Sequence, residues 1–336
     1  MNQPDSKLST LIMKPTLWKL TLCAACVCAS SLTAGANTLQ RSDVMDDPAW
    51  LVHLDFDGFR PTTLGQYVLA EMDKPEAKDK LAAFQTIFSF DLRKQLHGAT
   101  LYGSGLAPEE AVLIVYADFE ADRLVTLAKA AKDYHSKEHN QHVIHNWRDD
   151  HKKDKNGDKM RVYATIHGER VIFSQSESRV ALALDVLDRT APSLAAGSAF
   201  AGLGVPGNSH FLEAAARKMD FPDSTPNAAM LKLAKSLEFV LGEKDKKFHA
   251  AITLVADTEE SAGHIVSIAQ GLLALAKLQT EKPEATKFAD AVVIKQDGAR
   301  AHGSLTLPAG DILGMIKADA ARKAGDDAEK SEKVSK

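Results

Sequence analysis

Three side chains near the start of the chain combine imidazole and carboxylate chemistry at a regular spacing. His53, Asp55 and Asp57 lie two residues apart within WLVHLDFD, residues 50–57. The alternation of apolar and polar residues predicts a half-buried strand, from which these three side chains would project about 6–7 Å apart on one face. Such a set could bind a divalent metal ion or act as an acid–base pair. The simpler interpretation is the water-facing side of a strand whose other face carries Trp50, Val52, Leu54 and Phe56.

A second candidate is a histidine-rich segment. It holds five of the chain's 12 histidines: His135, His139, His142, His145 and His151. His135 and His139 are four residues apart, which on a helix would place both imidazoles on one face and suit Zn or Cu. The surrounding lysines and aspartates, with the Asn156-Gly157 turn signal, favour an exposed connection without metal instead. A calcium loop at residues 154–158 is excluded because the glutamate that should close it is missing.

The elements that must position these residues follow an internal repeat. Residues 101–132 and 240–277 share a strand–helix pattern at a constant offset of 139, with Gly103 and Asp118 matching Gly242 and Asp257. A fixed offset with matched hydrophobicity indicates a duplicated structural unit. We expect Asp118 and Asp257 to cap the helices that follow the repeated strands.

The remaining pattern predicts an α+β fold with two similar lobes, each an antiparallel sheet with helices packed on one face. Strands occur in pairs and hairpins between helices, and they do not alternate strictly with helices. Residues 160–166 pair with 170–175, and 291–296 pair with 299–307 around Asp297-Gly298. A single helix is expected over residues 75–96 and another over 226–236. Residues 209–219 fit either a strand or a helix.

Five segments are expected along the chain. Residues 1–36 form a signal peptide, 37–190 the first lobe, 191–208 a linker rich in Gly, Ala and Pro, 209–316 the second lobe, and 317–336 a disordered charged tail. Residues 37–48 read as a loose lead-in to the first lobe.

The leader indicates export. An apolar run over residues 20–32 precedes Ala34-Gly35-Ala36, whose small residues fit cleavage near Ala36. This run reaches about 20 Å as a helix, short of a bilayer core of about 30 Å, although an uncut N-terminal anchor is the alternative. All three cysteines lie in the leader, so the exported chain would carry no disulfide. No later stretch has the length of a transmembrane helix. We therefore expect a periplasmic or extracellular protein.

Charge and motifs narrow the function. Without residues 1–36 the chain has 38 basic and 44 acidic residues and no basic block, so nucleic acid is not an expected partner. Neither a phosphate-binding loop nor a Gly-x-Ser-x-Gly elbow is present. The first hypothesis is a non-catalytic binding or scaffold protein of the cell envelope that needs no cofactor and recognises a protein, peptide or envelope ligand. The second is a metal-binding protein or metal-dependent enzyme that uses His53, Asp55 and Asp57 or the histidines of residues 135–151.

Overall fold

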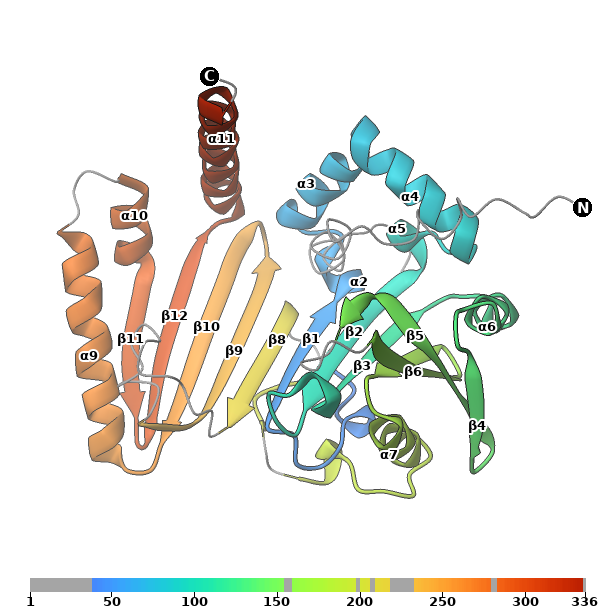
Figure 1. The fold of residues 1–336 in the computed structure, drawn as a ribbon. Helices are drawn as coiled ribbons and strands as arrows, with labels where there is room; N and C mark the ends of the chain where they lie inside the picture. Colours follow the sequence, from blue (N-terminus) through green and yellow to red (C-terminus); the bar gives the residue numbers. More distant parts are fainter. Residues whose placement is uncertain are drawn as a thin grey trace, which may run out of the picture. The chain divides into compact units, whose positions relative to one another are not determined.

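The computed structural model describes residues 38–153, 159–197, 200–205, 209–217, 233–278 and 283–334. The chain divides into two compact units (Figure 1). The first unit consists of Met1–Pro61 and Val68–Pro206, and the second of Thr62–Tyr67 and Gly207–Lys336. Each unit contains an antiparallel sheet and helices, which confirms the predicted α+β class.

The sheet of the first unit has seven strands among the described residues, in the order β1-β2-β3-β7-β6-β5-β4. Each is antiparallel to its neighbours. The strands are β1 (Trp50–Asp55), β2 (Leu96–Gly103), β3 (Ala111–Ala117), β4 (His135–His139), β5 (His142–Lys153), β6 (Lys159–His167) and β7 (Arg170–Ser174). The edge strand is therefore β4, which pairs only with β5 in this part of the chain.

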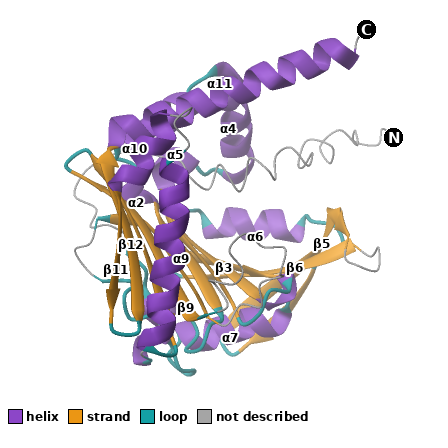
Figure 2. Cartoon of the chain, turned by 90° about the vertical axis from the view of Figure 1, so that its left-hand side faces the viewer, coloured by secondary structure: helices purple, strands orange, loops and turns teal. Residues whose placement is uncertain are grey.

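Helices cover both faces of this sheet, where the sequence predicts cover on one. The helices of this unit are α2 (Phe56–Phe59), α4 (Pro75–Phe88), α5 (Leu92–Gln95), α6 (Ala121–Lys129) and α7 (Glu177–Leu187), with 3-10 turns η1 (Arg41–Asp43), η2 (Pro108–Glu110) and η3 (Leu194–Ala196), and α3 (Thr63–Met72) belongs to it from Val68 onward. On one face Phe56, Leu96 and Ala117 form a cluster with aromatic residues of α4. Figure 2 shows α6 and α7 on opposite sides of the strands. Helix α7 buries Val180 and Leu184 completely.

The segments expected to be a loose lead-in and a linker also pack in the first unit. Leu39, Val44 and Leu194 are buried. The Leu194 amide donates to the Val44 carbonyl at 2.9 Å, and Met45 forms a bridge with Ser193. A few large apolar side chains within a small-residue segment are sufficient to anchor it, because each buried one removes apolar surface from water.

The second unit has a five-stranded sheet among its described residues, in the order β8-β9-β10-β12-β11. Its strands are β8 (His210–Arg217), β9 (Ala234–Lys244), β10 (Lys247–Ala256), β11 (Val292–Asp297) and β12 (Arg300–Pro308), and its helices are α9 (Glu259–Lys277), α10 (Pro283–Ala291) and α11 (Ala309–Val334). Helix α9 packs on the sheet through Ala262 and Ile265, which form a core cluster with Leu254, Ala256 and Ala301. No helix in the described ranges is long and apolar enough to cross a bilayer.

The predicted internal repeat is present as a shared topology. The order β1-β2-β3-β7-β6 corresponds strand for strand to β8-β9-β10-β12-β11. Ala117 and Ala256, which are 139 residues apart, make equivalent bonds: the Ala117 amide donates to the Glu169 carbonyl at 3.1 Å and the Ala256 amide to the Ala299 carbonyl at 2.9 Å. The two hairpin turns place Gly168 and Gly298 at φ of 58° and 52°. Glycine suits both turns because it has no Cβ to clash there.

The helix predicted over residues 75–96 is shorter than expected, and the segment predicted as either a strand or a helix forms a strand. The helix expected over residues 75–96 ends at Phe88, because Ser89 adopts a left-handed conformation with φ of 51°, and β2 starts at Leu96. Residues 210–217 form a strand despite three consecutive alanines, since pairing with β9 outweighs local helix propensity. Of the helix expected over residues 226–236, the part up to 232 lies outside the described residues, and the rest begins β9.

The predicted caps and tail also differ from the structure. Helix α9 is capped by Thr258, whose hydroxyl accepts the Ser261 amide at 3.1 Å, and α6 begins after Glu120 without a side-chain cap. Neither Asp257 nor Asp118 is the cap. Helix α11 continues through the expected disordered tail as far as Val334, where Ala, Lys and Glu residues favour helix. The predicted leader, residues 1–36, lies outside the described residues.

Candidate metal centre

His53 and Asp55 point into the core of the first unit. Each is 1 % exposed, and the burial of β1 alternates so that Leu51, His53 and Asp55 are inside while Trp50, Val52 and Leu54 are half-buried. The face expected to meet water is therefore the more deeply buried one. Asp57 does not share it, because β1 ends at Asp55, whose carboxylate caps α2 by accepting the Gly58 amide at 2.8 Å. The structure therefore does not bring the three side chains together on one strand face.

His53 begins a chain of buried hydrogen bonds. Its Nδ1 lies 2.9 Å from the Thr100 hydroxyl, which donates to the Tyr116 hydroxyl at 3.4 Å, which in turn donates to Asp43 at 3.4 Å. Asp43 is 1 % exposed and accepts from Arg170 at 2.7 Å. Burial and the nearby Asp43 carboxylate raise the pKa of Tyr116 well above its ordinary value. These hydrogen bonds satisfy polar groups within the core and leave Tyr116 neutral. The row of hydrogen bonds from His53 to Asp43 therefore has a structural role.

Asp57 takes part in a separate imidazole–carboxylate arrangement. His97 Nδ1 lies 3.0 Å from Asp57, its Nε2 lies 3.1 Å from Asp118, and Arg60 pairs with Asp57 at 2.9 Å. Each ring nitrogen of His97 therefore faces a carboxylate oxygen, a group that can only accept a hydrogen bond when it is ionised. His97 occupies a β-bulge of β2, which aims its ring between the two acids. Asp118, predicted as a helix cap, serves here as a partner of His97.

His135 and His139 lie on strand β4 and not on a helix. Four residues along a strand span about 13 Å, which is too far for two ligands of one ion. His135 is 64 % exposed and pairs with Asp133 at 3.1 Å. His139 pairs with Asp185 of α7 at 2.8 Å. The structure therefore separates the predicted helical pair.

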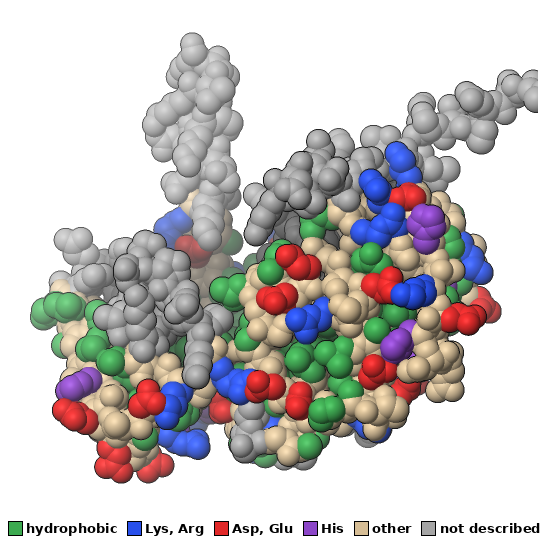
Figure 3. All heavy atoms as spheres, turned by 60° about the horizontal axis from the view of Figure 1, so that its bottom comes forward, with side chains coloured by type: hydrophobic (Ala, Val, Ile, Leu, Met, Phe, Trp, Pro, Cys, Tyr) green, Lys and Arg blue, Asp and Glu red, His purple; other side chains and the backbone are tan. Residues whose placement is uncertain are grey.

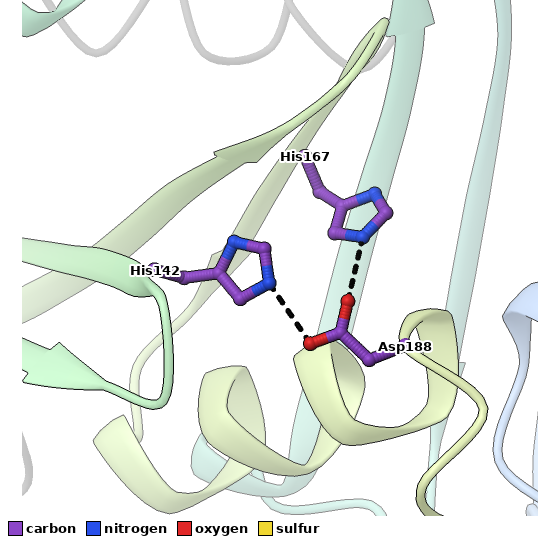
Figure 4. Close-up of side chains that lie close together, drawn as sticks. All are labelled: His142, His167 and Asp188. Carbon is purple, nitrogen blue, oxygen red and sulfur yellow. Dashed lines mark hydrogen bonds and ion pairs between the residues drawn. The ribbon is translucent and has the colours of Figure 1, made fainter.

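Three other side chains do converge, and they are His142, His167 and Asp188. Their potential ligand atoms all lie within 4.8 Å of one another. His142 Nε2 is 2.9 Å and His167 Nε2 is 3.0 Å from the two oxygens of Asp188, and the rings lie 5.1 Å apart between centroids. Figure 4 shows both imidazoles aimed at the carboxylate. The three side chains are 15 %, 24 % and 16 % exposed, so the group is partly shielded but within reach of solvent.

Each of these side chains comes from a different element. His142 begins β5 directly after the hairpin turn, His167 ends β6, and Asp188 is the C-cap of α7. Of these three residues, the sequence analysis identifies only His142 as a candidate ligand, as a member of the histidine-rich segment. His167 and Asp188 carry no motif, and Asp188 lies 46 residues from His142 and 21 from His167. No local spacing rule covers such distances.

The electrostatics favour a cation here. Burial would raise the pKa of Asp188, but hydrogen bonds from His167 and His142 outweigh it and lower the pKa below its ordinary value, so the carboxylate is charged. The C-terminal end of α7 adds partial negative charge.

The ligand set fits a small transition-metal ion. Two imidazoles and a carboxylate suit Zn²⁺ or Cu²⁺ better than Mg²⁺ or Ca²⁺. Ligand atoms on one such ion lie about 3–4 Å apart, so the side chains need only a small movement. One cost is visible at His167, whose Nδ1 is buried without a partner among the described residues. A metal ion bound at Nε2 would require the ring proton to be on Nδ1. This buried N–H without an acceptor would cost about 1–3 kcal/mol.

Comparison with known proteins adds little about the chemistry. No protein-family model matches the sequence, and no curated protein matches it. Among solved structures, TP0453 in crystal form III is 9 % identical over 86 % of this chain and 100 % of that chain, with a TM-score of 0.46. TP0453 in crystal form I is 10 % identical over 84 % and 98 %, with a TM-score of 0.40. A similarity of this size carries no information about a ligand or an activity.

Proposed function

We propose that this protein binds one divalent transition-metal ion, Zn²⁺ or Cu²⁺, through His142, His167 and Asp188. The observation that carries the proposal is the convergence of three ligand atoms within 4.8 Å from three separate elements. Three protein ligands leave at least one coordination position for water or another ligand. Binding would displace any proton from the metal-facing nitrogens, so affinity would fall at acid pH.

We further propose that the protein acts outside the cytoplasm, as the leader over residues 1–36 suggests. N-terminal sequencing of protein recovered from the periplasm or medium tests the point. A mature chain starting near Asn37 is expected in that fraction, and recovery of the chain only from the cytoplasm would contradict the proposal.

Calorimetric titration of the metal-free chain with Zn²⁺ and Cu²⁺ tests the metal centre. We expect one ion per chain, and we expect His142→Ala with His167→Ala to weaken binding more than 100-fold because one carboxylate remains. The matched control is His249→Ala with His302→Ala. These two histidines lie on strands of the second unit, where they bond Thr306 and Thr253. This double variant should bind as the parent does.

The binding-scaffold hypothesis predicts the opposite result. Under it the natively purified chain would contain no stoichiometric metal, and a chelator would leave its melting temperature unchanged. Equal loss of binding in both double variants would also contradict the proposed centre, because it would show that any pair of histidines accounts for the affinity.

A further inference from the structure

The β4–β5 hairpin is an addition to the repeated topology. It lies between α6 and β6 in the first unit, whereas the same place in the second unit, between α9 and β11, holds the helix α10. Strand β4 is exposed over residues 135–138 and pairs with β5 alone in the described sheet. Strand β5 is held more firmly, since Ile144 is 1 % exposed and β6 pairs with its other side. Core packing therefore fixes β5 from Ile144 onward, but neither β4 nor the hairpin end that carries His142.

The end of this hairpin is attached to α7 by polar pairs. Lys137 pairs with Glu177 at 2.5 Å, His139 with Asp185 at 2.8 Å and His142 with Asp188 at 2.9 Å. The side-chain amide of Asn140 also donates to Asp185 at 3.1 Å. Pairs at exposed positions stabilise a structure only weakly, because water and salt screen them. A stronger link at the hairpin end would change how often β4 detaches.

We propose that the metal ion bound by His142, His167 and Asp188 locks the β4–β5 hairpin onto α7, so that the ordering of edge strand β4 depends on the ion. The inference rests on the proposed metal function. One ion bonded to all three side chains would join the hairpin, the β6–β7 turn and the C-terminus of α7. His142 directly faces His139 across the hairpin, next to the turn at Asn140, so fixing His142 fixes the return of β4.

The role assigned to the ion is therefore structural control of a sheet edge. Free strand edges are where a sheet pairs with other chains, so an ion that holds the edge strand in place also controls what the edge presents. In its described residues the second unit has the helix α10 in place of the hairpin, and Asp297 occupies the position that His167 holds before the repeated glycine. It therefore provides an internal reference for the experiment.

Hydrogen exchange of the whole chain, with and without Zn²⁺ at about 100 times its Kd, tests the inference. Amides of residues 135–143 are expected to exchange up to about 100-fold more slowly with the ion, because binding to the docked form lowers the open population by that factor. Amides of β11 and β12 should be unchanged. Asp188→Asn should abolish the protection together with the affinity.

A control variant separates docking from ligation. Lys137→Ala removes the pair with Glu177 and no ligand, so exchange of β4 without metal should quicken while Zn²⁺ still binds and still slows it. Binding of one ion per chain with unchanged exchange of β4 would overturn the lock and leave the metal function intact. Absence of binding in the same samples would overturn both.

Discussion

The two units share a backbone plan but use the same sheet face differently. In the first unit Tyr116 pairs with Arg170 across β3 and β7, and in the second Val255 pairs with Arg300 across β10 and β12. Arg170 bonds the buried Asp43, whereas Arg300 is exposed. The repeat therefore preserves the hydrogen-bond ladder and a turn glycine, while the surrounding segments decide whether a given position is core or surface.

The inserted β4–β5 hairpin likewise changes the surroundings of repeated positions in the first unit. The β4–β5 hairpin supplies His142, the repeated β6–β7 turn supplies His167, and α7 supplies Asp188. The three side chains that could hold a metal ion therefore come together where the inserted hairpin packs beside elements of the repeated topology.

Charged side chains of both signs are interspersed on the face in Figure 3, so it shows no block of one sign.

The largest expected difference in stability is between loss of the buried acceptor of Arg170 and loss of Arg300, which holds the equivalent position in the second unit. Asp43→Ala should lower the free energy of unfolding by about 2–3 kcal/mol, because it leaves Arg170 and Tyr116 without their buried acceptor. Arg300→Ala should change it by no more than about 0.5 kcal/mol. Urea denaturation of both variants measures the difference. Equal small effects would mean that the buried chain does not stabilise the first unit.

A smaller contrast concerns the helices that follow the repeated strands. Thr258→Ala should cost about 1 kcal/mol, because the Ser261 amide loses its acceptor at the start of α9. Asp257→Ala should cost less than about 0.5 kcal/mol, since the pair that its carboxylate makes with Lys235 among the described residues is exposed. Thermal melts of the two variants compare them directly. A larger effect from Asp257 would restore it as the cap that the sequence suggests.

One pH dependence should come from Asp188, the carboxylate of the proposed metal centre. The pKa of Asp188 is lowered in the folded state, so its contribution to stability is fully present above the unfolded pKa of about 3.9 and is lost as pH falls through the folded value. The stability difference between the parent and Asp188→Asn should therefore shrink below about pH 4. Denaturation at pH 3 and pH 6 in chelator checks the sign, and a difference that grows on acidification would contradict it.

The smallest expected effect is common to both units. Burial lowers the pKa of His145, helped by Lys129, and burial with the charge of His249 lowers the pKa of His210. The unfolded chain therefore takes up protons first, and these groups weaken the fold as pH falls below about 6.5. NMR titration should find the midpoint of each imidazole below pH 6.5. A midpoint above 6.5 for either would contradict its burial.

The sequence by itself determined the α+β class, the repeat at an offset of 139 and the hairpin at Asp297-Gly298, because periodicity and turn chemistry act over a few residues and recur in each copy. Only the tertiary structure decided which face of β1 is inside. Alternation separates Leu51, His53 and Asp55 from their neighbours but does not say which set is inside, and packing in the first unit buries this set while leaving the other half-buried. The metal-competent group was likewise decided by folding, since Asp188 is 46 residues from His142 and meets it only when α7 packs beside the hairpin. Local patterns fix local conformation, whereas the position of a partner distant in sequence depends on how the elements pack.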